Sequence, residues 1–127
     1  KKIPIYGDGS NIRDWLFVKD HCKILNEILK KGKNKQSYNI GGNNELSNLK
    51  LVKKICSIFN SINQNYDHFQ LISFVKDRSG HDFRYGINNK KTKKLIDKKF
   101  YKTNFDENLV NTINWYLANK YMLFKKH

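Results

Sequence analysis

Apolar residues recur along this chain in short blocks, some with the two-residue period of a β-strand and others with the period of a helix. Residues 1–18 predict a strand, a turn at residues 7–9 and a second short strand at residues 15–18. Two further apolar blocks of strand length follow at residues 38–40 and 71–75. Strands that are separated by helical segments predict the α/β class, in a chain too short for a doubly wound sheet.

Two helices are expected in the first half of the chain. The first begins near Asp20, has lysines in its last turn that suit the helix dipole, and ends at Gly32. Its apolar face is predicted to consist of Val18, Cys22, Leu25 and Leu29. The second helix begins after Ser47, which has the side chain of a good N-cap. Its apolar face is predicted to consist of Val52, Ile55, Cys56 and Phe59.

Two more helices are expected in the last third of the chain. A short one covers residues 89–96, and the last one begins near Thr103 or Asn104. Thr103 and Asp106 are arranged like a capping box at its start. The apolar stripe of this last helix is predicted to consist of Leu109, Ile113, Tyr116 and Leu117.

The net charge of +14 would ordinarily favour nucleic acid or an anionic membrane as a partner. The lysines that supply it are spread over helix faces and loops and do not form one stripe. The chain is also rich in Lys, Asn, Ile, Tyr and Phe and has a single alanine, which is typical of an AT-rich coding sequence. We therefore expect no nucleic-acid partner, and a basic nucleic-acid-binding module is kept as the alternative of a different class.

No apolar run is long enough to span a bilayer, and residues 1–20 show no signal peptide, so we expect no membrane partner and a cytoplasmic location. Cys22 and Cys56 lie on different predicted helices and lack the spacing of metal ligands. Both thiols are therefore expected to be buried and reduced, and no bound metal is expected.

Three of the 25 basic side chains are arginines, and two of these, Arg78 and Arg84, lie in the segment 77–85. The third, Arg13, lies in a second dense segment at residues 12–21. Where lysine is the default cation, an arginine is expected at a position that needs its planar fork of donors. A diphosphate or a buried carboxylate is the usual reason.

Five segments carry a resemblance to a known family: PIYGDG at 4–9, IRDWLFVKDH at 12–21, YNIGG at 38–42, DRSGHDFRY at 77–85 and WYLAN at 115–119. They resemble the C-terminal part of dTDP-glucose 4,6-dehydratases, which belong to the extended short-chain dehydrogenase/reductase superfamily with its Rossmann-like NAD-binding fold. IRDW is shared by many nucleotide-sugar epimerases and dehydratases, whereas the segment 77–85 is more specific. Ser79 and Phe83 replace a proline and an arginine that the family usually has.

The resemblance implies a binding site for a dTDP-sugar. The residues that it places there are Pro4, Ile5, Tyr6, Arg13, Asn48, Asp77, Arg78, Ser79, Gly80 and His81. The first three would flank the thymine base, Arg13 would reach the diphosphate, and the loop at residues 77–81 would be a second anion-binding element. Arg78 and His81 are its expected contacts.

The residues alone leave structural alternatives open for this site. Arg13 could pair with Asp14 and pin its own turn, and His81 could be a structural hydrogen-bond donor. Asn48 could be a helix cap, and residues 4–6 could be an ordinary half-buried strand.

The catalytic and cofactor motifs of the family precede the matched segments, and none is recognised here. Tyr116 and Lys120 have the Tyr-x-x-x-Lys spelling of the catalytic pair, but they lie on the last helix, so Tyr116 is predicted to be part of the core. Gly7 and Gly9 lack the third glycine of a dinucleotide loop and are predicted to form a turn.

Residues 1–127 are therefore expected to be a single, incomplete domain, the C-terminal substrate-binding part of the fold without its N-terminal dinucleotide-binding part. In the family, NAD takes a hydride from carbon 4 of dTDP-glucose, water leaves across carbons 5 and 6, and the hydride returns to carbon 6. The resemblance implies that the complete enzyme is a homodimer. Alone, the chain is expected to be inactive and poorly folded. A fragment of a UDP-sugar epimerase or decarboxylase is the alternative within the superfamily.

Overall fold

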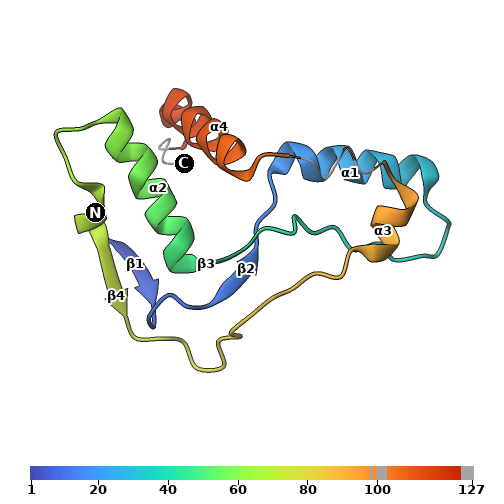
Figure 1. Ribbon diagram of the computed structural model, residues 1–127, viewed down its shortest axis with the longest axis horizontal. Coiled ribbons are helices and arrows are strands. Elements are labelled where there is room, and N and C mark those ends of the chain that lie inside the picture. Colours follow the sequence, from blue (N-terminus) through green and yellow to red (C-terminus); the bar gives the residue numbers. More distant parts are fainter. Residues whose placement is uncertain (98, 100–102, 124–127) are drawn as a thin grey trace.

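The computed structural model describes residues 1–97, 99 and 103–123, and Figure 1 shows its helices and strands. The strands are β1 (Ile3–Tyr6), β2 (Ile12–Asp14), β3 (Glu45–Ser47) and β4 (Ile72–Val75). The helices are α1 (Val18–Lys31), α2 (Asn48–Ile62), α3 (Lys90–Leu95), α4 (Phe105–Ala118) and α5 (Lys120–Leu123), and a 3-10 turn covers His68–Leu71. This confirms the predicted α/β class.

The strands form two small sheets. β1 pairs in parallel with β4, and Tyr6 lies opposite Val75. β2 pairs with β3 in antiparallel orientation, and Ile12 lies opposite Ser47. Ile12 also forms a bridge to Arg84, so the segment that follows β4 returns to the other edge of β2. The predicted anion-binding loop is thereby brought next to the strand that carries the first predicted arginine.

A tight turn between β1 and β2 sets the direction of β2. Gly9 has a φ of 74°, and its amide donates a hydrogen bond to the Tyr6 carbonyl oxygen at 3.1 Å. A Cβ atom on Gly9 would lie 2.7 Å from Ile5 Cγ2 and 2.8 Å from Leu49 Cβ. The positive φ and the close approach of α2 both favour glycine here. The prediction of a turn at residues 7–9 is confirmed.

The helices occupy the two ends of an elongated molecule. Figure 1 shows α2 beside β1 and β4 at one end and α1 with α3 at the other, with α4 between them. Asp20 of α1 is 3% exposed, and Asn108 of α4 donates a hydrogen bond to its carboxylate at 3.1 Å. Among the described residues, the buried apolar ones are few: Ile5, Ile24, Leu51, Cys56, Ile96 and Ile113. A small core of this kind leaves much apolar surface in contact with water.

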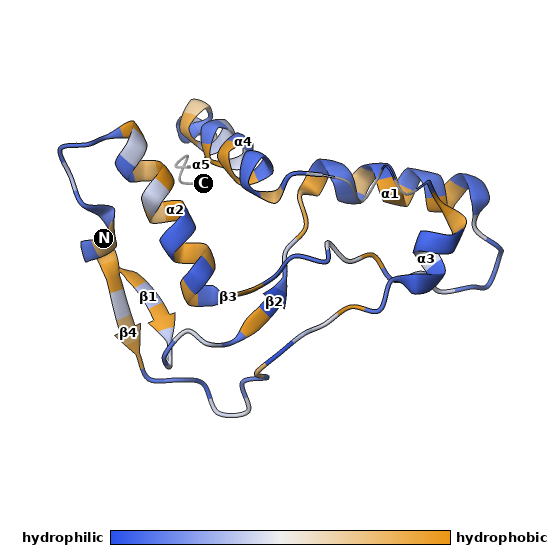
Figure 2. Ribbon diagram, in the orientation of Figure 1, coloured by the Kyte–Doolittle hydropathy of each residue, from blue (hydrophilic) through white to orange (hydrophobic). Residues whose placement is uncertain are grey.

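The predicted apolar face of α1 is wrong. Val18, Leu25 and Leu29 are 65%, 56% and 83% exposed, and Cys22, which was expected to be buried, is exposed as well. The helix is buried instead through Ile24, which is 0% exposed, on the side that packs against α3 and α4. Figure 2 shows apolar positions recurring along α1. The apolar stripe is present, but the described part of the chain supplies nothing to pack on it.

Other differences concern strand and helix ends. Residues 15–17 are not a strand, and α1 begins at Val18, two residues before Asp20. Residues 38–40 are also not a strand, because no other described segment pairs with them.

The N-cap of α2 is confirmed, because the Ser47 hydroxyl accepts a hydrogen bond from the Lys50 amide at 3.2 Å. The cap of α4 is Asn104, which accepts from the amides of Asp106 and Glu107, so the capping box based on Thr103 is wrong. Tyr116 is 50% exposed and not part of the core.

Candidate functional site

Nine of the ten residues that the sequence placed at a nucleotide line two hollows, and Tyr6, which lines one of them, contacts Arg78 and His81 of the other. The arginine hollow, of about 350 Å³, is lined by Arg13, Arg78, Ser79, Gly80, His81, Asp82 and Tyr85. The β1 hollow, of about 200 Å³, is lined by Pro4, Ile5, Tyr6, Trp15, Asn48, Leu51 and Val52. The Arg78 guanidinium lies 5.0 Å from the centroid of the Tyr6 ring, and the His81 ring meets the same ring edge-on at 6.3 Å.

Arg13 is held by backbone oxygen atoms of β2 and of the loop beside it. Its Nη2 donates to the carbonyl oxygen of Asp82 at 3.0 Å, and its Nη1 donates to those of Ile12 at 2.7 Å and Phe83 at 3.5 Å. The guanidinium also lies over the Tyr85 ring, 4.4 Å from the centroid. These contacts fix the direction of the guanidinium and also hold the loop against β2.

The pair between Arg13 and Asp14 is not formed. Asp14 Oδ1 accepts a hydrogen bond from the Asn44 amide at 2.9 Å, and no salt bridge joins it to Arg13 within the described residues. The alternative that Arg13 pairs with Asp14 is therefore wrong. The side chain still has a structural role, because it binds backbone oxygen atoms.

His81 is oriented from both ring nitrogen atoms, and its side chain is 5% exposed. Arg13 Nη2 lies 3.0 Å from Nε2, and Asp77 Oδ1 lies 2.7 Å from Nδ1. Because an arginine can only donate, Nε2 accepts and the ring proton is on Nδ1, from which it is donated to Asp77. This hydrogen bond, followed by one from the Arg78 amide, lowers the pKa of Asp77 below its usual range. Asp77 thus does not line a hollow but orients a residue that does.

Arg78 differs from Arg13 because its guanidinium makes no hydrogen bond or salt bridge with the described residues. Its contact is the stacking on Tyr6, which leaves its donors available to an anion. The backbone next to it is open, since Gly80 has a φ of 68° and a Cβ atom there would meet nothing within 4 Å. The His81 amide donates to the Arg78 carbonyl oxygen at 3.2 Å and closes the turn.

The β1 hollow combines an apolar wall with one amide side chain. Ile5 is 4% exposed, and Tyr6 is 43% exposed at the boundary with the arginine hollow. Asn48 is half-buried, its side chain makes no hydrogen bond among the described residues, and its backbone amide donates to the Asn11 carbonyl oxygen at 3.0 Å. Ser47 is the cap of α2, so the alternative of a capping role for Asn48 is wrong.

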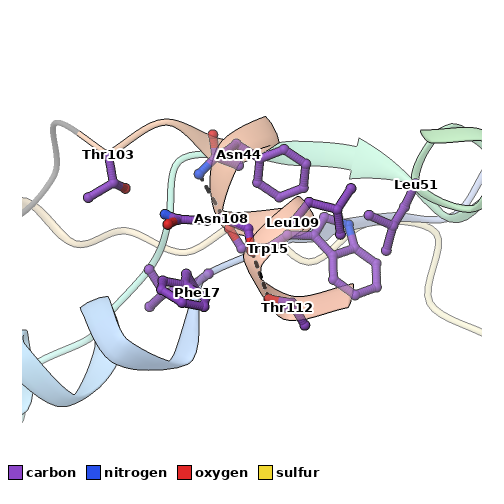
Figure 3. Close-up of a pocket in the computed structure, with 10 residues that line it drawn as sticks. Trp15, Phe17, Asn44, Leu51, Thr103, Asn108, Leu109 and Thr112 are labelled. Atoms are coloured by element: carbon purple, nitrogen blue, oxygen red, sulfur yellow. Dashed lines mark hydrogen bonds between the residues drawn. The ribbon is translucent and has the colours of Figure 1, made fainter. Parts of the chain in front are cut away.

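A third hollow, of about 250 Å³, lies between α4 and the segment after β2 and is drawn in Figure 3. Two of its polar side chains have hydrogen-bond partners on carbonyl oxygen atoms within the chain. Thr112 donates to the Asn108 carbonyl oxygen at 2.8 Å, and the Asn44 amide group lies 3.4 Å from the Trp15 carbonyl oxygen. Among the residues that the structure describes, no charged side chain lines it, so these residues do not supply the groups that an anionic ligand needs.

The residues described here do not fit a dinucleotide cofactor. A Rossmann-type dinucleotide site needs a glycine-rich turn that leads into a helix N-terminus. Gly9 is instead packed against Ile5 and Leu49, and β2 follows the turn. Within the described residues, no group of three His, Cys, Asp or Glu side chains could hold a metal ion, and no helix is long and apolar enough to cross a membrane.

Two residues of the arginine hollow were not predicted. Tyr85 supports Arg13 through its ring, and its hydroxyl donates to the Asp82 carboxylate, which raises the pKa of Tyr85. Both residues lie in the segment 77–85 that the sequence had singled out. Asp82 and Tyr85 could have been identified as site residues only by knowing that this segment pairs with β2.

The comparisons with known proteins agree with the resemblance in the sequence. A probable dTDP-glucose 4,6-dehydratase from Sinorhizobium fredii is 45% identical over 120 residues, which are 94% of this chain and 34% of the relative. The crystal structure of dTDP-glucose 4,6-dehydratase from Bacillus anthracis in complex with NAD is 39% identical and superposes with a TM-score of 0.76, over 95% of this chain and 36% of that one.

The structure of UDP-glucose 4-epimerase from Thermotoga maritima, with UDP-glucose, is 20% identical over 94% of this chain and 36% of that one. Its TM-score of 0.74 shows a shared fold alone. The chain thus spans about a third of the length of the relatives it matches. The family model described as GDP-mannose 4,6 dehydratase matches residues 1–112, and this chain therefore belongs to that family.

Proposed function

We propose that this chain binds the nucleotide of a dTDP-sugar, as the substrate-binding part of a dTDP-glucose 4,6-dehydratase that forms dTDP-4-keto-6-deoxyglucose. The observation that carries the proposal is a pair of unlike hollows linked by Tyr6, which lines the β1 hollow and contacts Arg78 and His81 of the arginine hollow. One has an arginine with unused donors, as a diphosphate requires, and the other has a flat apolar wall with one amide, as a base requires.

The proposed roles follow from the contacts. Arg78 forks onto diphosphate oxygen atoms, and Arg13 adds a second fixed positive charge. Gly80 and Ser79 allow the diphosphate to approach the loop backbone. Asn48 donates to or accepts from the edge of the base, while Tyr6 with Pro4 and Ile5 lies along the face of the base. His81 holds the hollow in shape through its two hydrogen bonds.

The remaining part of the enzyme is proposed from the length of the relatives. The chain covers 34% of the Sinorhizobium fredii relative, and its residues do not fit NAD, so NAD and the catalytic groups of this lyase belong to the part it does not cover. The exposed stripe of Val18, Leu25 and Leu29 on α1 is proposed as the surface on which that part packs.

Three further proposals concern the whole protein. Alone, the chain is inactive, because it lacks the groups for hydride transfer. The complete enzyme is a homodimer, for which the resemblance is the support. Its location is the cytoplasm, where the free thiols of Cys22 and Cys56 would stay reduced.

One calorimetric titration series, on the chain co-expressed with the N-terminal two-thirds of a relative, separates the proposal from its alternatives. We expect dTDP to bind more tightly than UDP, by roughly tenfold, because the β1 hollow gains the contact of the thymine methyl group. Affinity for UDP equal to or above that for dTDP would instead support the UDP-sugar enzyme. Duplex DNA is titrated at two salt concentrations, and an affinity that exceeds that for dTDP and falls steeply with salt would support the nucleic-acid-binding module.

A further inference from the structure

The loop that carries Arg78 and His81 is joined to the sheet by one ion pair outside the arginine hollow. Arg84 Nε donates to Glu45 Oε2 and Arg84 Nη2 donates to Glu45 Oε1, both at 2.7 Å. Glu45 belongs to β3, whereas the backbone of Arg84 lies on the opposite edge of β2, next to Ile12. The side-chain pair therefore crosses the middle strand and ties its two neighbours together.

The surroundings are shaped for this pair. Glu45 lies opposite Asp14 in the register of β2 and β3, so the Glu45 carboxylate has an acidic cross-strand neighbour while Arg84 is its basic partner. A Cβ atom on Gly86 would lie 3.0 Å from both Arg84 Nη2 and Glu45 Oε1, so glycine at this position leaves room for the fork. The hydrogen bonds between the partners lower the pKa of Glu45 and raise that of Arg84, which keeps both charged.

The pair has a direct structural route to the arginine hollow. The backbone of the loop touches β2 through the Ile12 amide, which donates to the Phe83 carbonyl oxygen at 2.7 Å, and through the Tyr85 amide, which donates to the Ile12 carbonyl oxygen at 3.1 Å. The Phe83 carbonyl oxygen also accepts a hydrogen bond from Arg13, and Arg13 in turn contacts His81. A loop that moved away from β2 at Arg84 would lose these contacts together.

We infer that Glu45 and Arg84 are positioning residues, which hold the segment 77–85 against β2 so that Arg78 and His81 face the arginine hollow. The inference rests on the proposed function only for its consequence on nucleotide affinity. The consequence for the loop itself can be measured without any ligand.

The test is a double-mutant cycle of Glu45→Gln, Arg84→Gln and the double variant, made in the chain co-expressed with the N-terminal two-thirds of a relative. It is read by hydrogen exchange without ligand and by calorimetric titration with dTDP. Each single variant should speed amide exchange in residues 77–85 and weaken dTDP binding by about fivefold, which is what a well-aligned exposed ion pair contributes. The double variant should add nothing further, because one interaction is removed in all three. Exchange in α2 should stay unchanged.

Glu27→Gln is the matched control, because Glu27 pairs with Lys31 at 2.6 Å on α1, outside both hollows. The inference would be overturned if Glu45→Gln left amide exchange in residues 77–85 and dTDP affinity unchanged. It would also be overturned if the loss of dTDP affinity in the double variant were the product of the losses in the two single variants. A wild-type chain that does not bind dTDP, with the loop loosened in the variants, would refute the proposed function and leave the inference supported. Binding by the wild type with no change in the variants would refute the inference alone.

Discussion

Replacing Arg78 by lysine keeps a positive charge in the arginine hollow but removes the planar fork of donors. Arg78 makes no hydrogen bond to the described part of the chain, and what the substitution removes from the fold is its stacking on Tyr6 at 5.0 Å. The free energy of unfolding should therefore change by less than about 0.5 kcal/mol. Losing one charge-assisted hydrogen bond to the diphosphate costs about 1.5 to 3 kcal/mol, so dTDP affinity should fall roughly tenfold or more.

Arg13→Lys should behave differently, because its guanidinium already holds the carbonyl oxygen atoms of Ile12, Asp82 and Phe83. A lysine ammonium cannot reach these acceptors in the same fork geometry. We expect stability to fall by about 1 to 3 kcal/mol and dTDP affinity to fall with it, since the loop is released.

The two variants are compared by urea unfolding and by calorimetric titration with dTDP. The reasoning predicts a loss of affinity alone for Arg78→Lys and a loss of both quantities for Arg13→Lys. Unchanged dTDP affinity in Arg78→Lys would refute the assignment of the diphosphate to this residue. An unchanged free energy of unfolding in Arg13→Lys would refute the role of Arg13 in holding the loop against β2.

Three further predictions concern other parts of the fold. Asn108→Ala should lower the free energy of unfolding by about 1 to 3 kcal/mol in urea titrations, because it leaves the buried carboxylate of Asp20 without its amide donor, and an unchanged value would contradict this. The pKa of Asp77 is lowered mainly by the hydrogen bond from His81. Above pH 3.8, the ordinary pKa of Asp77, Asp77→Asn should therefore have a lower free energy of unfolding than the wild type, and this difference should disappear as the pH falls further. A difference that stays constant with pH would show that the ionised Asp77 carboxylate does not stabilise the fold. Leu29→Gln should change the free energy of unfolding by less than about 0.5 kcal/mol, since Leu29 is 83% exposed. It should reduce the dehydratase activity that is restored when the chain is co-expressed with the N-terminal two-thirds of a relative. Unaltered activity in this assay would contradict the proposed packing surface.

Sequence periodicity predicted which elements form but not what they pack against. β1, β4 and α2 follow from apolar blocks and from the Ser47 cap, which are local signals. The stripe on α1 was recognised from the same kind of pattern, yet Leu25 is 56% exposed and Ile24 is buried. A helical pattern marks an apolar face without saying whether its partner belongs to the same segment of chain.

The candidate site shows the same limit. The motifs predicted Arg13 and Arg78 together, but in equivalent roles. The structure separates them, because the partners of Arg13 at Asp82 and Phe83 lie 69 and 70 residues away along the chain. Strand pairing at this separation depends on the whole fold, and no local pattern carries it. Arg84 was noted in the sequence as one of three arginines, but its partner Glu45 was not identified for the same reason.

A crystal structure of the chain with dTDP tests the central claim most directly. The account predicts diphosphate oxygen atoms within hydrogen-bond distance of the Arg78 guanidinium and the thymine along Tyr6, Pro4 and Ile5, with the Asn48 amide at its edge. A nucleotide bound in the third hollow beside α4, or one whose diphosphate makes no contact with Arg78, would contradict it.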